Sequence, residues 1–98
     1  MKLTNKREQE LRDSAQAFKA MSDETRQKIL ILLNERPMNV TEIVSNFSLA
    51  QPTISRHLAV LRHAGLVSAK RSSQHMIYQL ERDNLSKFCN GFMDNFSS

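Results

Sequence analysis

The chain has 98 residues, 40% of them hydrophobic, with two glycines, two prolines and one cysteine, and its formal net charge is +4 at pH 7. This length predicts a single domain, 1–98, and the scarcity of helix breakers favours a mainly helical fold. The lone Cys89 excludes an internal disulfide. Because no apolar run reaches the roughly 18 residues that a transmembrane helix needs, and no signal peptide is expected, we predict a cytoplasmic protein without a membrane partner.

Positive charge is concentrated in the middle of the chain. Residues 43–80 contain no Asp or Glu but hold four Lys or Arg residues and all three histidines. The segments on either side nearly balance their charges. A basic region without acids is typical of proteins that bind a polyanion such as nucleic acid.

Two helices are predicted before this basic region. The first, 4–21, places Leu11 and Phe18 on one face by their helical spacing. Residues 22–23 then break and recap the chain, because Ser and Asp both favour N-cap positions. The second helix, 24–34, is apolar almost all round near its end and is therefore expected in the core.

A helix-turn-helix is predicted over residues 41–64. A short helix, 42–47, is expected to be capped by Thr41 and joined by a brief turn to a second helix. Pro52 suits the first turn of that second helix, and Gly65 suits the position just past its end. Apolar residues between them repeat at helical spacing, which predicts one buried face.

The other face of this second helix carries short or forked side chains that form hydrogen bonds. They occupy the first turns, the part of a recognition helix that enters the major groove of DNA. Arg and Gln can pair with base edges, and a Thr methyl suits the methyl of thymine. An ordinary solvated helix face would have a similar composition. The predicted DNA-contacting residues are Gln51, Thr53, Ser55, Arg56 and His57.

A β-hairpin, or wing, is predicted over residues 66–80. Its two strands, 66–71 and 75–80, alternate apolar and polar residues. The link between them lacks Gly and Asn, so we expect a wide, mobile loop rather than a tight two-residue turn. Cationic and polar side chains near this tip would bind phosphates. The residues expected to do so are Lys70, Arg71, Ser73 and Gln74.

A last helix is predicted over residues 83–96. It holds three of the five phenylalanines, more aromatic surface than a small domain usually needs on a terminal helix. We therefore predict that 4–21 and 83–96 form a homodimer interface; the alternative is that this apolar stripe packs on its own core. The expected interface residues are Leu11, Phe18, Leu85, Phe88, Phe92 and Phe96.

With its predicted order of four helices, two strands and a helix, the chain resembles the ArsR/SmtB family of bacterial winged helix-turn-helix repressors. The motifs that carry the resemblance are FKAMSDETRQKILILL at 18–33, TEIVSNFSLAQPTISRHLAVLRHAGLV at 41–67 and IYQL at 77–80. It implies a homodimer that binds a double-stranded operator, expected to be an imperfect inverted repeat. It also implies that an inducer, which the sequence does not identify, releases the DNA.

Metal sensing through the sites known in that family is not expected. Asn39 and Thr41 stand where one family site has a Cys-x-Cys pair, and the last helix has no histidine for the other site. Soft metals need thiolates or imidazoles, so we expect neither a metal nor another cofactor. Cys89 is expected to be a small apolar side chain in the helix interface. The alternatives are a redox role for Cys89, through an intersubunit disulfide or a modification, and release of the DNA by a partner protein.

Two further function classes are less favoured than a repressor. A protein-interaction module could use the same fold with its aromatic last helix as the partner face, but the acid-free region 43–80 favours DNA. An enzyme is not expected, because the sequence has no nucleophile–base pair, carboxylate dyad or glycine-rich phosphate loop. No catalytic residue is therefore predicted.

Overall fold

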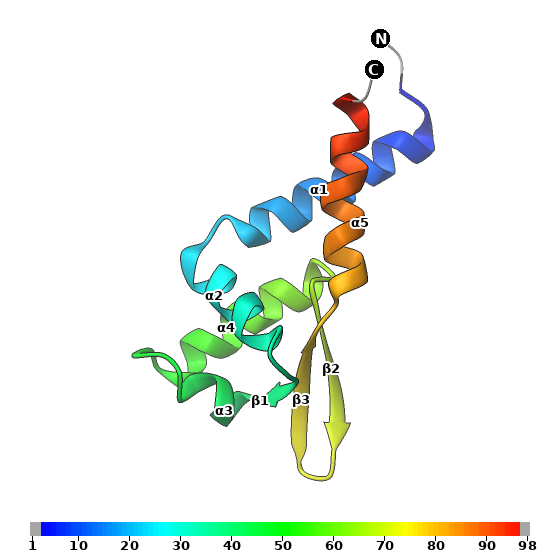
Figure 1. Ribbon diagram of the computed structural model, residues 1–98. Coiled ribbons are helices and arrows are strands. Elements are labelled where there is room, and N and C mark those ends of the chain that lie inside the picture. Colours follow the sequence, from blue (N-terminus) through cyan, green and yellow to red (C-terminus); the bar gives the residue numbers. More distant parts are fainter. Residues whose placement is uncertain (1–2, 97–98) are drawn as a thin grey trace.

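The computed structural model describes residues 3–96 (Figure 1). In chain order its elements are α1 (Asn5–Met21), α2 (Glu24–Leu33), β1 (Met38–Asn39), α3 (Val40–Val44), α4 (Gln51–His63), β2 (Val67–Ser72), β3 (His75–Leu80), α5 (Arg82–Met93) and the short 3₁₀ helix η1 (Asp94–Phe96). This order confirms the predicted mainly helical fold with a β-hairpin wing. No helix in the described part of the chain is long and apolar enough to cross a bilayer.

The core lies where α2, α3 and α4 pack together beneath α1 (Figure 1). The predicted apolar face of α4 supplies three of its residues, and each is at most 1% exposed: Ile54, Leu58 and Leu61. Full burial of such a side chain is worth about 1.5–3 kcal/mol, so this face fixes the helix firmly on the domain. The opposite face of α4 is therefore held in a defined orientation toward the exterior.

The sheet has three antiparallel strands in the order β1-β3-β2. β1 was not predicted, because a strand of two residues is too short to show an alternating pattern. Met38 pairs with Tyr78 and Asn39 with Ile77, so β1 closes the inner edge of the wing against α3. The outer strand, β2, pairs with β3 along its whole length.

The tip of the wing is tighter than predicted. Ser72 pairs with His75, which leaves only Ser73 and Gln74 in the turn. Ser73 has a φ of 59°, the left-handed conformation that two-residue hairpin turns need at their first central position. The expectation of a wide loop was wrong, because a serine adopts here the conformation that usually marks Gly, Asn or Asp.

The cap of α3 also differs from the prediction. Asn39, not Thr41, precedes the helix, and its Oδ1 accepts a hydrogen bond from the backbone N–H of Glu42 at 2.9 Å. The carboxylate of Glu42 accepts one in return from the backbone N–H of Asn39 at 3.0 Å, which completes a capping box. Arg36 donates to the other carboxylate oxygen at 2.8 Å. Because β1 ends at Asn39, the helix begins two residues earlier than expected.

Because of this capping box, the free energy of unfolding should fall at acid pH. The backbone N–H of Asn39, and then Arg36, hold the pKa of Glu42 below its ordinary value. A carboxyl with a lowered pKa stabilises the folded state above its ordinary pKa, and this contribution is lost as the pH falls through the lowered value. We therefore expect Glu42→Gln to lower the urea midpoint at pH 7 by more than it does at pH 3. An equal difference at both pH values would contradict this.

Candidate nucleic-acid interface

The first turns of α4 present a polar edge to the exterior. Gln51, Ser55 and Arg56 are exposed and Thr53 is half-buried. The guanidinium of Arg56 lies 3.5 Å from the hydroxyl of Thr53, one helical turn earlier. Four of the five predicted contact residues therefore lie on the accessible side of the first turns of α4, and their hydrogen-bonding groups match those that recognise base edges.

The beginning of α4 is suited to approach a phosphate. Ala50 occupies the N-cap position with extended backbone and has no side chain that could cap the helix, while Pro52 lies in the first turn. The backbone N–H groups at such a helix start carry partial positive charge and favour an anion. With no acidic residue in the first turn of α4, nothing on this turn repels a polyanion.

His57 is set apart from the other four residues. Its side chain is only 19% exposed, and its Nδ1 lies 3.4 Å from a guanidinium nitrogen of Arg26 and 3.9 Å from the carboxylate of Asp23. The same Arg26 donates from Nε to the carbonyl oxygen of Ala20 at 2.6 Å, at the end of α1. The imidazole thus joins α4 to the corner between α1 and α2.

Asp23 and Arg26 were not predicted to belong to the site. Asp23 was recognised only as the cap of α2, and it does accept a hydrogen bond from the backbone N–H of Arg26 at 3.0 Å. That N–H is the main reason why the pKa of Asp23 lies below its ordinary value, with a further contribution from His57. The only signal in the sequence was the cap itself, because pairing with His57 depends on how α2 and α4 pack.

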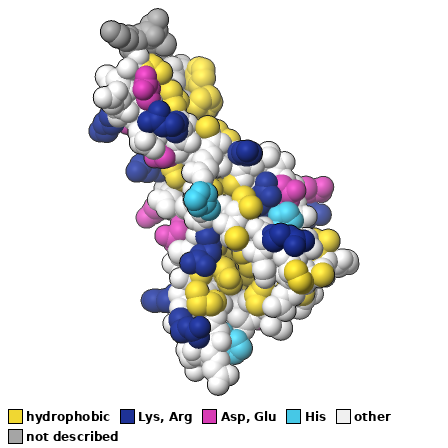
Figure 2. Space-filling model, turned by 180° about the vertical axis from the view of Figure 1, so that it is seen from behind, with side chains coloured by type: hydrophobic (Ala, Val, Ile, Leu, Met, Phe, Trp, Pro, Cys, Tyr) yellow, Lys and Arg dark blue, Asp and Glu magenta, His cyan; other side chains and the backbone are white. Residues whose placement is uncertain are grey.

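The wing projects from the domain and carries cations close to its tip. The predicted phosphate-contacting residues Lys70, Arg71, Ser73 and Gln74 are all exposed, and so is His75. Figure 2 shows that the lower part of this face, which ends at the wing, carries Lys, Arg and His side chains and no Asp or Glu. The basic region of the sequence therefore presents several cationic side chains on one face without an acid among them in the lower part of that face, an arrangement suited to a phosphate backbone.

The chain is similar to known proteins of one family. Residues 23–69 match the family described as bacterial regulatory protein, arsR family. The transcriptional repressor SdpR of Bacillus subtilis (strain 168) is 40% identical over 77 residues, which cover 79% of this chain and 86% of SdpR. The chain belongs to the arsR family. This confirms the resemblance found in the sequence, and it makes the chain a transcriptional regulator rather than an enzyme.

Solved structures give the same fold as this arsR-family chain. An ArsR-like transcriptional regulator from Rhodococcus sp. RHA1 has a TM-score of 0.80 and 25% identity, covering 86% of this chain and 79% of the other. The solution structure of a homodimeric winged helix-turn-helix DNA-binding domain, Mb0332 from Mycobacterium bovis, has a TM-score of 0.78 and 24% identity, covering 97% and 89%. The wing and the helix-turn-helix are therefore shared with known regulators.

The two terminal helices of this arsR-family regulator pack against each other within one chain. Phe18 of α1 and Phe92 of α5 meet edge to face, with their centroids 5.4 Å apart, and Phe92 meets Phe96 in the same way at 5.2 Å. Leu85 and Phe88 pack on the core of their own chain, as the alternative prediction had it. The end of the stripe remains open: Phe92 is 38%, Met93 62% and Phe96 67% exposed.

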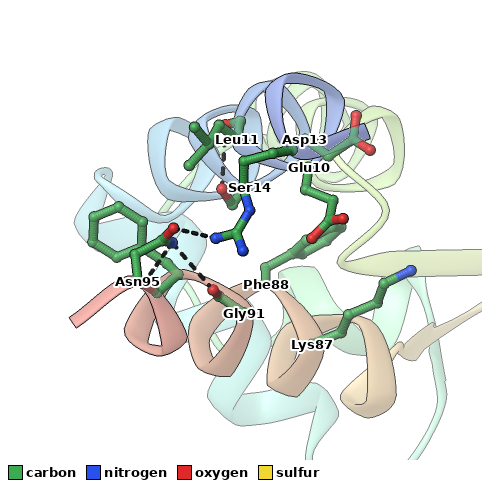
Figure 3. Close-up of a pocket in the computed structure, with 10 residues that line it drawn as sticks. Glu10, Leu11, Asp13, Ser14, Lys87, Phe88, Gly91 and Asn95 are labelled. Carbon is green, nitrogen blue, oxygen red and sulfur yellow. Dashed lines mark hydrogen bonds between the residues drawn. The ribbon is translucent and has the colours of Figure 1, made fainter. Parts of the chain in front are cut away.

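A small cavity of about 110 Å³ lies between these helices (Figure 3). Leu11 and Phe88 line it with apolar surface, while Glu10 and Lys87 flank it (Figure 3). Arg7 closes one end by donating to the side chain of Asn95. Leu11 therefore belongs to the packing between α1 and α5, and any dimer contact it makes would extend that packing.

The described part of the regulator holds no cluster of potential metal ligands. Among residues 3–96, no group of three His, Cys, Asp or Glu side chains is placed to hold a metal ion. Asn39, at the position of a family thiolate, is instead the cap of α3. Cys89 is half-buried on α5 with a free thiol.

Proposed function

We propose that two copies of this arsR-family repressor bind an inverted-repeat operator, each with α4 in the major groove and its wing on the phosphate backbone. The observation that carries the proposal is the contrast between the two sides of α4. Ile54, Leu58 and Leu61 are fully buried, whereas the side with Gln51 and Arg56 is polar, exposed and free of acids. A helix held this rigidly can present a fixed pattern of donors and acceptors to base edges.

A homodimer is supported by the open end of the aromatic stripe. Met93 and Phe96 are largely exposed beside the α1–α5 pair, and a second copy would cover them. The structurally similar Mb0332 domain is described as homodimeric. Two copies related by a twofold axis would place their α4 helices roughly 34 Å apart, on successive major grooves, which is why the operator should be an inverted repeat.

We further propose that soft metals do not release the operator through the known family sites, because this chain lacks the ligands of those sites. Asn39 and Thr41 provide no thiolate, and α5 contains no histidine. Oxygen ligands of amide and hydroxyl type bind soft metals poorly. The inducing signal should therefore act elsewhere on the protein or through a partner.

The proposed function is tested by titrating the full chain into the DNA upstream of its own coding sequence, in a band-shift assay between 50 and 200 mM salt. An equally long fragment from inside the coding sequence is the control. We expect tight binding to the upstream fragment that weakens steeply with salt, because counterions are released from the phosphates. Failure to bind either fragment at 50 mM salt would overturn the proposal and favour a protein-interaction module.

The wing should supply affinity without sequence preference. Replacing Lys70 and Arg71 together with alanine should weaken binding to all duplexes by a similar factor. The slope of log K against log salt should become shallower by about 0.9 for each phosphate that the variant no longer neutralises. Fluorescence anisotropy on the operator and on an unrelated duplex measures both quantities. A weakening confined to the operator would instead show that the wing contacts bases.

His57 should position α4 rather than contact a base. We expect His57→Ala to lower affinity while leaving the preferred bases unchanged, and Asp23→Asn to lower it too although Asp23 lies on α2. Because the two residues act together, the double variant should be less impaired than the sum of the single variants, with a coupling of roughly 0.5 kcal/mol or more. Additive effects, or a changed preference at one operator position, would contradict the positioning role.

A further inference from the structure

A groove separates α1 from the second half of α4, on the side of α1 that faces away from α5. Its walls include Lys19 and Ala20 of α1, Val60 and His63 of α4, and Arg26 of α2, and its volume is about 470 Å³. Small-molecule sites in proteins typically measure 300–1,000 Å³ and combine an apolar lining with a few polar groups. The groove therefore has the size of a ligand site.

The chemistry of the groove selects one class of ligand. Alanines and Val60 form an apolar floor, and Val60 is 41% exposed although the apolar face of the same helix is buried. The polar residues at the groove are Gln16, Lys19, Arg26 and His63, whose side chains can hydrogen-bond or carry positive charge, and none of the lining residues has a carboxylate. Such a set complements a negative head group attached to a hydrocarbon body.

We propose that this groove binds a small amphiphilic anion, such as an alkyl or aryl carboxylate, and that the bound anion is an effector of DNA binding. The carboxylate would lie between Lys19 and His63, and the hydrocarbon would cover Val60. The second half of the proposal rests on the proposed function, since it requires that α4 is the DNA-contacting helix.

Arg26 provides the physical link between the groove and the DNA-contacting surface. It lines the groove, and its guanidinium also lies 3.4 Å from His57 and donates to the carbonyl oxygens of Ala20 and Lys19. A carboxylate in the groove competes with these partners for the guanidinium. Binding of the anion therefore changes how α4 is held at the α1–α2 corner. The anion alters DNA binding to the extent that it binds more tightly to one position of α4 than to the other.

The groove is distinct from the face proposed for dimerisation. On α1, the residues that line the cavity against α5 are Arg7, Leu11 and Ser14, whereas the groove uses Lys19 and Ala20. At 100° per residue these two sets lie on different sides of the helix. A second copy that covers α5 and η1 would therefore leave the groove accessible to a small molecule.

The test is a titration of the ¹⁵N-labelled full chain with 4-phenylbutyrate, followed by backbone amide NMR, with the neutral 4-phenylbutanol as the matched control ligand. We expect shifts concentrated at residues 19–20 and 59–64, and at least tenfold weaker binding of the alcohol. The double variant Lys19→Gln/His63→Gln should bind the anion at least fivefold more weakly. Lys28→Gln, which removes an exposed lysine outside the groove, should bind it normally. An unchanged amide spectrum in the absence of ligand verifies the fold of each variant.

Three results would overturn the ligand site: no localised shifts at 10 mM anion, equal binding of the alcohol, or shifts centred on α5 and η1. The effector role is tested by band shift on the upstream fragment, where 4-phenylbutyrate should raise the Kd at least threefold for the natural chain but not for the double variant. An unchanged Kd at saturating anion would overturn it. If the natural chain binds DNA but not the anion, only the proposed ligand site is contradicted. If it binds the anion but no DNA, the proposed function is contradicted.

Discussion

Replacing Arg56 with alanine should weaken operator binding by about 1–3 kcal/mol and relax the base preference at one operator position. Arg56 is exposed in the first turns of α4 and lies against Thr53, so its guanidinium points along the surface that would enter the major groove. A guanidinium can donate two parallel hydrogen bonds to the edge of guanine, and no other side chain on this edge offers that geometry. Anisotropy titrations on the operator and on single-base variants of it measure both effects.

Arg62→Ala provides the matched control for this experiment. Arg62 lies on the same helix and is also exposed, but it is in the last turn, away from the predicted point of contact. Both variants lose one positive charge, but Arg62 is away from the DNA, so Arg62→Ala should leave the affinity and its salt dependence nearly unchanged. Only Arg56→Ala should lose discrimination between bases. If the two variants had the same base preferences as the natural chain, Arg56 would not be a base-contacting residue.

Placing a charge on the exposed end of α5 should separate the dimer into monomers. Met93 is 62% exposed beside Phe96 and lies outside the core of its own chain, so Met93→Glu should leave the monomer folded. A carboxylate buried at an interface without a partner costs several kcal/mol, so the dissociation constant of the dimer should rise by orders of magnitude. Light scattering coupled to size exclusion should show a dimer for the natural chain and a monomer for the variant.

Ile31→Glu is the control, because Ile31 is an exposed apolar residue of similar size on α2, with 70% exposure. This variant should remain dimeric. The monomeric Met93→Glu variant should also bind the operator more weakly. The two half-sites of the operator would then be bound by separate monomers and not by one dimer. A dimer that survives Met93→Glu, or one that dissociates with Ile31→Glu, would place the interface elsewhere.

The sequence predicted those features that depend on repeated patterns. The buried face of α4 follows from three apolar residues at helical spacing, and its start and end follow from Pro52 and from Gly65, whose φ is 79°. The wing follows from alternation in two strands of six residues. In each case several residues carry the same signal, so that local preference and burial agree.

Features that depend on a single residue were not predictable in the same way. Ser73 takes a left-handed conformation for which its residue type gives little warning, and Asn39 displaces Thr41 as a cap only because β1 ends there. His57 lies about 60° around the helix from Ile54, at the margin of the buried stripe. Which way such a side chain turns is decided by Asp23 and Arg26 on a neighbouring helix.

The most direct measurement of the central claim is selection of bound duplexes from a pool of random DNA by the natural chain, followed by sequencing. If two α4 helices contact successive major grooves, the enriched duplexes should contain an inverted repeat whose half-sites are centred about 10 base pairs, or a multiple of that, apart. Repeating the selection with Arg56→Ala should remove the preference for one base in each half-site. A pool that remains unenriched, or an enriched site without twofold symmetry, would contradict the account.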